Sequence, residues 1–303
     1  MTSIPPSDEL RVHVFRHLAM ACVFEIAIEE ESEEYARQAA DAAFAELDRL
    51  EGELSRFIPS SDISRINGSP GIMVRIGEDA LQCLEIAAWL HEETGGAFDP
   101  TLGAILEERR RADGSIADPT DASELDETPL GMKVLYLDRE AHTAGLASDT
   151  VRIDLGAIGK GYALDKAAEI LIDWSIDAAL LHSGQSTVLA LGAPGGRDGW
   201  TISLRDPDGG IDPLGNVVLC DEAASGSALT VRDRHILDPR TGLPAVGKRG
   251  TWSISSSAAI SDGLSTAFMV MKPEEIADFC REHEDLAGLI LDEAGVLTPY
   301  SWK

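Results

Sequence analysis

The chain has 303 residues, 44% of them hydrophobic, which is enough apolar side chain for one large globular domain or two modest ones. Its 25 basic and 53 acidic residues give a formal net charge of −28, which argues against a broad binding surface for nucleic acid or an anionic membrane. The four cysteines show no C-x-x-C spacing, so neither a zinc site nor a redox pair is indicated.

The N-terminal residues lack a basic segment followed by an apolar one, and no apolar run approaches the length of a bilayer span. We therefore expect a cytoplasmic protein without a membrane or nucleic-acid partner.

The chain opens with a pattern typical of two strands and a helix. Apolar and polar residues alternate over residues 12–20 and 21–29, which predicts neighbouring strands. From Tyr35 to Leu54 apolar residues recur at steps of three and four, which predicts an amphipathic helix with Ser32 as its N-cap.

The next segment is predicted to be loop, helix and loop. Residues 55–77 are polar and rich in glycine and proline, whereas residues 78–93 have helical spacing and end before a glycine pair. A short helix is expected from Thr101. Residues 109–127 are charged with little periodicity, which predicts a surface excursion.

The second half alternates short strands with helices. Strands are predicted near residues 133–137 and 150–155, a helix from about Tyr162 to Trp174, and further helices from Ser261 and Pro273. Between and after them lie short apolar runs typical of antiparallel strands, at residues 178–184, 186–192, 199–206, 216–223, 231–237, 286–292 and 296–302. The expected fold class is therefore α+β, with largely antiparallel sheets and flanking helices.

The glycine-rich turn in VRIDLGAIGKGYALDKAA, residues 151–168, is the first candidate site. A turn at a helix start exposes backbone N–H groups that favour anions, and Lys160 adds a positive charge beside them. The spacing matches neither the dinucleotide nor the P-loop fingerprint. The alternative is a tight strand-to-helix connection that only needs small residues.

A second candidate is SDGLSTAF, residues 261–268. Asp262, Ser265 and Thr266 stand at i, i+3 and i+4, so a helix would place their oxygens on one face. Magnesium prefers such a set of one carboxylate and neutral oxygens. The alternative is a helix N-terminal turn in which Asp262 and Ser265 bond exposed amides.

His235 lies in HILDPRTG, where the following residues have turn chemistry. A histidine there is either structural or a general base that takes the proton of an attacking hydroxyl. An anion site, a magnesium face and a base fit together as phosphoryl or nucleotidyl chemistry.

Five segments together resemble the ApbE family of FAD:protein FMN transferases, in the order in which that family carries them. They are SRFIPSSDISRIN, TGGAFDPTLG, IDLGAIGKGYALDKA, HILDPRTG and SDGLSTAF. The resemblance covers nearly the full chain. It implies a single ApbE-like domain over residues 1–303, with an FAD and magnesium site between two lobes.

The resemblance also implies roles for individual residues. FAD would be held by Met20, Ala97, Phe98, Asp99, Asp154, Lys160 and Ile236, and Mg²⁺ by the Ala157 carbonyl with Asp262, Ser265 and Thr266. His235 would deprotonate a threonine or serine hydroxyl of an acceptor protein, which attacks the FMN-side phosphorus and releases AMP. Lys160 and Mg²⁺ would stabilise the developing charge.

One segment departs from the family pattern. His182 to Ser186 reads HSGQS where relatives carry a glycine pair, and Gln185 adopts a positive φ less easily than glycine. Two alternatives therefore remain beside FMN transfer, namely hydrolysis of FAD to FMN and AMP, and FAD binding without turnover.

Overall fold

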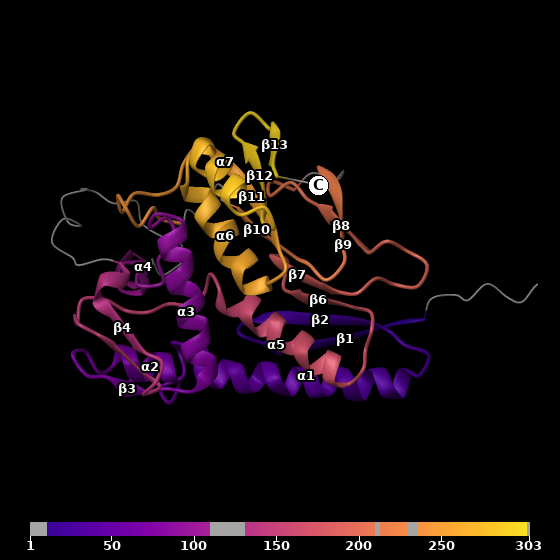
Figure 1. Cartoon of the computed structure of the whole chain (residues 1–303), viewed down its shortest axis with the longest axis horizontal. Coiled ribbons are helices and arrows are strands. Elements are labelled where there is room, and N and C mark those ends of the chain that lie inside the picture. The colour runs from indigo at the N-terminus through magenta and orange to yellow at the C-terminus, as the bar shows by residue number, and fades with distance from the viewer. Residues whose placement is uncertain (1–10, 110–130, 210–212, 229–235, 302–303) are drawn as a thin grey trace, which may run out of the picture.

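The computed structural model describes residues 11–109, 131–209, 213–228 and 236–301 (Figure 1). Within them the main sheet has eight strands, and each strand is antiparallel to its neighbours. In spatial order they are β1 (Val12–Ala19), β2 (Cys22–Glu29), β6 (Ala179–Ser183), β7 (Thr187–Leu191), β10 (Ala223–Ala228), β11 (Lys248–Ser255), β12 (Ala287–Asp292) and β13 (Leu297–Tyr300). With its flanking helices, this sheet confirms the predicted α+β class.

The two faces of the main sheet bury different partners. On β7, Leu189 packs with the helices, whereas Val188 and Ala190 belong to a second apolar cluster. This alternation follows from the period of two in a strand. The helical face carries α1 (Glu33–Leu54), α5 (Gly159–Asp173) and α6 (Ala258–Val270), and the other is covered by the hairpin of β8 (Trp200–Leu204) and β9 (Gly215–Leu219).

Predicted boundaries of three helices are confirmed. The Ser32 hydroxyl accepts a hydrogen bond from the Tyr35 N–H at 3.2 Å and caps α1. Helix α3 spans Glu78–Glu93, and α7 spans Pro273–Glu282 with its proline in the first turn. The expected short helix is α4 (Gly103–Arg109). Within the described residues, none of the helices has both the length and the apolarity that a bilayer span requires.

The predicted strand over residues 150–155 is wrong. Val151 and Ile153 are buried, but the segment makes only one isolated bridge, from Arg152 to Leu102. The Asn67 side-chain amide takes the place of a strand partner, because it accepts from the Ile153 N–H at 2.7 Å and donates to the Ile153 carbonyl at 2.9 Å. The alternation of apolar and polar residues over 150–155 therefore indicates which side chains are buried and not that the segment pairs in a sheet.

The predicted loop over residues 55–77 also contains regular structure. It holds helix α2 (Asp62–Asn67), capped by Ser61, and strand β3 (Val74–Arg75). Strand β3 pairs with β5 (Thr143–Leu146), which pairs with β4 (Leu135–Asp138) after a 3-10 turn at Met132–Val134. These strands are short and depend on tertiary pairing, so local pattern did not reveal them.

Helix α6 begins at Ala258 and not at the predicted Ser261. Ser257 is its N-cap, and the Asp165 carboxylate on α5 accepts from the N–H groups of Ala258 at 2.6 Å and Ala259 at 3.0 Å. This long-range cap satisfies the first turn and places Asp262 in the second turn. Helix α5 likewise begins earlier than predicted, at Gly159.

Candidate functional site

Helices α5 and α6 meet at Gly161, and the contact leaves no room for a side chain. A Cβ at this position would lie 2.2 Å from the Ala258 carbonyl oxygen. The Gly161 N–H donates to Asp262 Oδ2 at 3.2 Å. Glycine at 161 therefore sets the distance between the two helices and joins the glycine-rich turn to the predicted magnesium face.

The sequence predicts that the glycine-rich turn offers its backbone N–H groups to an anion. In the structure its glycine N–H groups are not available for this. The Gly156 N–H donates to Asp154 Oδ1 at 2.8 Å, and the Gly159 N–H donates to the Leu155 carbonyl at 2.7 Å. Since Gly161 bonds Asp262, all three glycine N–H groups are used inside the protein. The turn lines the cavity with Gly156, Ala157 and Lys160, and its charged group there is the Lys160 ammonium.

Asp262 is the buried charge of the site, with 4% of its surface exposed. Its Oδ1 accepts from the hydroxyls of Thr187 at 3.1 Å and Ser225 at 3.3 Å. Together with the Gly161 N–H on Oδ2, these donors supply the partners that a buried carboxylate needs. The alternative interpretation, in which Asp262 bonds exposed amides in the first turn of its own helix, is wrong, because Asp262 lies in the second turn of α6 and the amide that it bonds belongs to α5.

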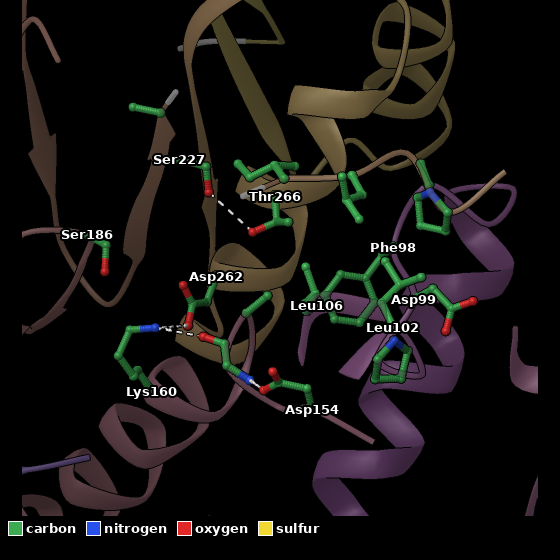
Figure 2. Close-up of a pocket in the computed structure, with 18 of the residues that line it drawn as sticks. Phe98, Asp99, Leu102, Leu106, Asp154, Lys160, Ser186, Ser227, Asp262 and Thr266 are labelled. Atoms are coloured by element: carbon green, nitrogen blue, oxygen red, sulfur yellow. Dashed lines mark hydrogen bonds and ion pairs between the residues drawn. The ribbon is translucent and has the colours of Figure 1, made fainter. Parts of the chain in front are cut away.

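Lys160 holds its ammonium over this carboxylate, as Figure 2 shows. Its Nζ lies 3.8 Å from Asp262 Oδ2 and donates to the Gly156 carbonyl at 2.8 Å. The Lys160 side chain keeps 26% exposure, so the positive charge remains accessible from the cavity.

Thr266 lies one turn after Asp262, and both side chains line the same cavity. Ser265 does not line it. Its hydroxyl is buried against β10, 2.9 Å from Ser227 Oγ and 3.3 Å from Ser225 Oγ. The structure thus brings together Ala157, Asp262 and Thr266 of the predicted metal set, with Ser265 directly behind them.

The cavity has a volume of about 500 Å³. One wall is polar and comes from α5, α6 and β10, and the other is apolar, with Phe98, Leu102 and Leu106 (Figure 2). Such a division suits a ligand with a charged centre and aromatic ends. The lining residues among those described are Ala97, Phe98, Asp99, Pro100, Leu102, Leu106, Asp154, Gly156, Ala157, Lys160, Ser186, Gly226, Ser227, Ala228, Ile236, Leu237, Pro239, Asp262 and Thr266.

Asp154 is held in place by an arginine that sequence reasoning missed. Arg56 Nε lies 3.0 Å from Asp154 Oδ2, and its Nη1 donates to Glu107 on α4. The Arg56 side chain is only 7% exposed and stacks on the Phe57 ring. The available signal is the SRF sequence at residues 55–57, which belongs to one of the five segments that resemble the ApbE family.

Ala97 and Phe98 are buried in the apolar wall, whereas the Asp99 carboxylate points away from Lys160 and Asp262 (Figure 2). Asp99 Oδ1 accepts from the Thr101 N–H at 2.8 Å and from the Thr101 hydroxyl at 2.6 Å. Burial raises the pKa of Asp99, and these bonds oppose that rise. In this structure Asp99 shapes the turn that carries Phe98.

The remaining predicted residues lie in three different situations. Ile236 lines the cavity and is buried. Met20 lies in the β1–β2 turn with φ 49° and packs against the main core, outside the cavity lining. His235 lies outside the described residues, as do residues 231–235 of the predicted strand and residues 110–127 of the predicted excursion, whose first residue, Arg109, ends α4.

The unusual HSGQS segment comprises the last two residues of β6 and the turn to β7. Gly184 has the positive φ, 62°, and the exposed Gln185 is absent from the positive-φ residues of the described chain. The replacement of glycine by Gln185 therefore creates no backbone strain there. Ser186, the last residue of the segment, lines the cavity.

The cavity has the donor chemistry that magnesium requires. Among the described residues no group of three His, Cys, Asp or Glu side chains could hold a metal, so a site rich in carboxylates or imidazoles is absent there. Magnesium is usually bound by one or two carboxylates, neutral oxygens and retained waters. Asp262, Thr266 and Ala157 supply such a set at one end of the cavity.

Comparisons with known proteins show the family of this chain. A profile of the ApbE family matches residues 20–290. The FAD:protein FMN transferase of Treponema pallidum is 30% identical over 281 residues, which cover 84% of this chain and 76% of that protein. The protein of the same name from Rhodobacter capsulatus is 34% identical over 196 residues, covering 59% of this chain and 36% of that protein.

Solved structures agree as well. The ApbE protein of Thermotoga maritima has a TM-score of 0.85 at 28% identity, over 96% of this chain and 97% of that chain. The flavinyl transferase ApbE of Pseudomonas stutzeri has a TM-score of 0.82 at 22% identity, over 96% of each chain, and supports the fold alone.

Proposed function

Because the chain belongs to the ApbE family, we propose that it transfers FMN from FAD to a threonine or serine hydroxyl of an acceptor protein, in a magnesium-dependent reaction that releases AMP. Its relatives are named FAD:protein FMN transferases, so the enzyme class and the flavin substrate follow from the family. The observation that carries the finer proposal is the convergence of Lys160, Asp262, Thr266 and Ala157 on one cavity.

Charge balance supports a divalent cation. Among the cavity-lining residues that the structure describes, Lys160 is the only basic one, beside three aspartates. The charge of Asp154 is paired with Arg56, and the Asp99 carboxylate points away. The positive charge of Lys160 is therefore balanced by the negative charge of Asp262. The pyrophosphate of FAD would then bring uncompensated negative charge. Mg²⁺, held by Asp262, Thr266 and the Ala157 carbonyl, would neutralise it and polarise the reacting phosphorus.

The chain's own residues would then perform the transfer as follows. The acceptor hydroxyl oxygen bonds to the FMN-side phosphorus while the bond from that phosphorus to the bridging oxygen breaks, and AMP leaves with this oxygen. His235 accepts the hydroxyl proton. Lys160, directed at the polar end of the cavity, stabilises the negative charge that develops on the leaving phosphate.

The assignment of His235 rests on sequence position. Ile236, which follows it, lines the cavity, and the Leu237 N-terminal to the DPRTG turn does so too. FAD would lie with its aromatic part along Phe98 and Ile236, and Met20 would contact flavin only from the neighbouring β1–β2 turn. We also propose that residues 1–303 act as one unit, with this cavity between two lobes.

Mass spectrometry of an acceptor domain incubated with the enzyme, FAD and Mg²⁺ tests the proposal. We expect the acceptor to gain the mass of FMN, and His235→Asn to lose transfer by roughly 10²- to 10⁴-fold, because a general base typically contributes that much. His142→Asn is the matched control. His142 lies in the β4–β5 turn and pairs with Glu78 of α3, and its φ of 50° is one that asparagine tolerates.

Two outcomes would contradict the proposal. Free FMN and AMP without an adduct would indicate hydrolysis, and tight FAD binding without any product would indicate a binding protein. Full transfer by His235→Asn would remove His235 from the mechanism and leave the activity itself standing.

A further inference from the structure

A chain of hydroxyl groups runs from the cavity into the contact between α6 and β10. Thr266 lines the cavity, and its Oγ1 lies 3.2 Å from Ser227 Oγ, the dashed link in Figure 2. Ser227 Oγ lies 2.9 Å from Ser265 Oγ. Ser265 in turn donates to the main-chain carbonyl of Asp262 at 2.9 Å. The chain therefore begins at a cavity side chain and ends at a group that can only accept.

The accepting carbonyl sets the direction of every hydrogen bond in this chain. A hydroxyl has one proton to donate and lone pairs that accept. Because the Ser265 proton is committed to the Asp262 carbonyl, Ser265 accepts from Ser227. Ser227 has then given its proton, so it accepts from Thr266. The Thr266 proton is consequently committed to Ser227, which also lines the cavity, and the remaining lone pairs of Thr266 are free to face a ligand.

A second set of hydroxyls obeys the same logic around the carboxylate. Thr187 and Ser225 both lie within hydrogen-bond reach of Asp262 Oδ1, at 3.1 and 3.3 Å, and 2.9 Å from each other, so the hydroxyl that donates to the carboxylate accepts from the other. Asp262 accepts at both oxygens, so no donor of this set turns toward the cavity. The floor of the cavity beside Lys160 thus presents carboxylate and hydroxyl lone pairs.

On this basis we propose that Ser227 is a positioning residue that turns the Thr266 hydroxyl so that its lone pairs face the cavity as a ligand for a divalent cation. The inference rests on the proposed function, because it concerns the same magnesium site. Ser227 also lines the cavity, but in this proposal its contribution comes through Thr266 and not through direct binding of the cation. It acts through Thr266, as hydrogen-bond partners behind metal ligands orient those ligands and tune affinity.

Titration of the purified full-length protein with Mn²⁺ in the presence of FAD, followed by electron paramagnetic resonance of free Mn²⁺, tests this. We expect Ser227→Ala to weaken Mn²⁺ binding about 10-fold, the lower end of the usual effect of such partners. Ser227→Thr retains the hydroxyl and should restore affinity. Ser203→Ala, the matched control, removes a hydroxyl of the β8–β9 hairpin that bonds the Asn216 side chain outside the cavity lining, and should leave Mn²⁺ affinity unchanged.

A double-mutant cycle separates positioning from a merely structural effect. If Ser227 acts through Thr266, the double variant with Thr266→Val binds Mn²⁺ no more weakly than Thr266→Val alone, whereas independent effects add. Should Ser227→Ala fail to fold, Ser227→Cys replaces it, since sulfur keeps the volume and accepts poorly.

The outcomes are distinguishable from those of the proposed function. Wild-type Mn²⁺ affinity in Ser227→Ala, or additive losses in the cycle, would overturn the positioning of Thr266 and leave the metal site intact. Absence of Mn²⁺ binding by the wild-type protein with FAD would overturn the magnesium site and this inference together.

Discussion

Two lysines lie beside α6, one near its start and one at its end, and their partners differ. Lys160 meets the Asp262 carboxylate at 3.8 Å and one carbonyl, and 26% of its side chain is exposed to the cavity. Lys248 is 8% exposed and donates to the carbonyls of Phe268 at 2.7 Å, Met269 at 3.3 Å and Met271. All three carbonyls belong to the C-terminal end of α6.

The comparison shows how the same side chain serves two purposes. The last carbonyls of a helix lack partners within the helix, and an ammonium with three donors satisfies them. Lys248 is therefore saturated by the protein, and no ligand can use it. Lys160 keeps an unsatisfied side toward the cavity, which suits it to an anionic group of a substrate.

The largest expected effect is on activity, from Lys160→Met. We expect FMN transfer to fall roughly 100-fold, because a positioned cation facing developing charge is lost. The free energy of unfolding should change by less than about 1 kcal/mol, as is typical of a partly exposed ion pair. Transfer assays and urea unfolding check the two parts. Unchanged transfer would remove Lys160 from the catalytic set.

Lys248→Met should show the opposite profile. We expect the free energy of unfolding to fall by about 2 kcal/mol, because helix-end carbonyls are left buried without a donor. Activity per folded molecule should stay at the wild-type level. A 100-fold loss of transfer in a fully folded Lys248→Met protein would break the distinction between the two lysines.

The smallest expected effect is a pH dependence of the Lys248 contribution to the free energy of unfolding. Burial lowers the pKa of Lys248 from 10.5 to about 8. As the pH rises above 8, the folded chain releases this proton before the unfolded chain does, so the Lys248 contribution to stability increases up to about pH 10.5. Below pH 8 that contribution is constant.

The measurement is the difference in unfolding free energy between wild type and Lys248→Met at pH 7.5 and 9.5. We expect this difference to shift in favour of the wild type by roughly 1–2 kcal/mol, since one pKa unit corresponds to about 1.4 kcal/mol. A constant difference across this range would show that Lys248 keeps an ordinary pKa in the folded protein.

Sequence reasoning identified the elements whose determinants are local. Helices α1 and α3 follow from apolar spacing and caps, and the cavity residues Lys160, Asp262 and Thr266 follow from motifs that lie on or next to single helices. The α+β class also follows, because short apolar runs separated by turns predict antiparallel strands.

Reasoning from sequence failed where a distant side chain decided the local structure. Asn67 completes the backbone hydrogen bonds of Ile153, so an alternating segment needs no strand partner. Asp165 caps α6 three residues before the predicted start. The role of Arg56 depends on its ion pairs with Asp154 and Glu107, which lie far from it in the chain.

The sequence by itself determined which chemical groups are available to this protein. They are the glycine-rich turn with Lys160, the helix face with Asp262, Ser265 and Thr266, and the motifs of its family, in a strongly acidic chain. The tertiary structure alone decided how these groups are used. The three glycine amides predicted to bind an anion are bonded within the protein, that of Gly161 through the contact between α5 and α6, and packing of α6 on β10 turns Ser265 inward. Periodicity and motif are properties of neighbouring residues, whereas the direction of a buried hydrogen bond depends on every partner the fold brings to it.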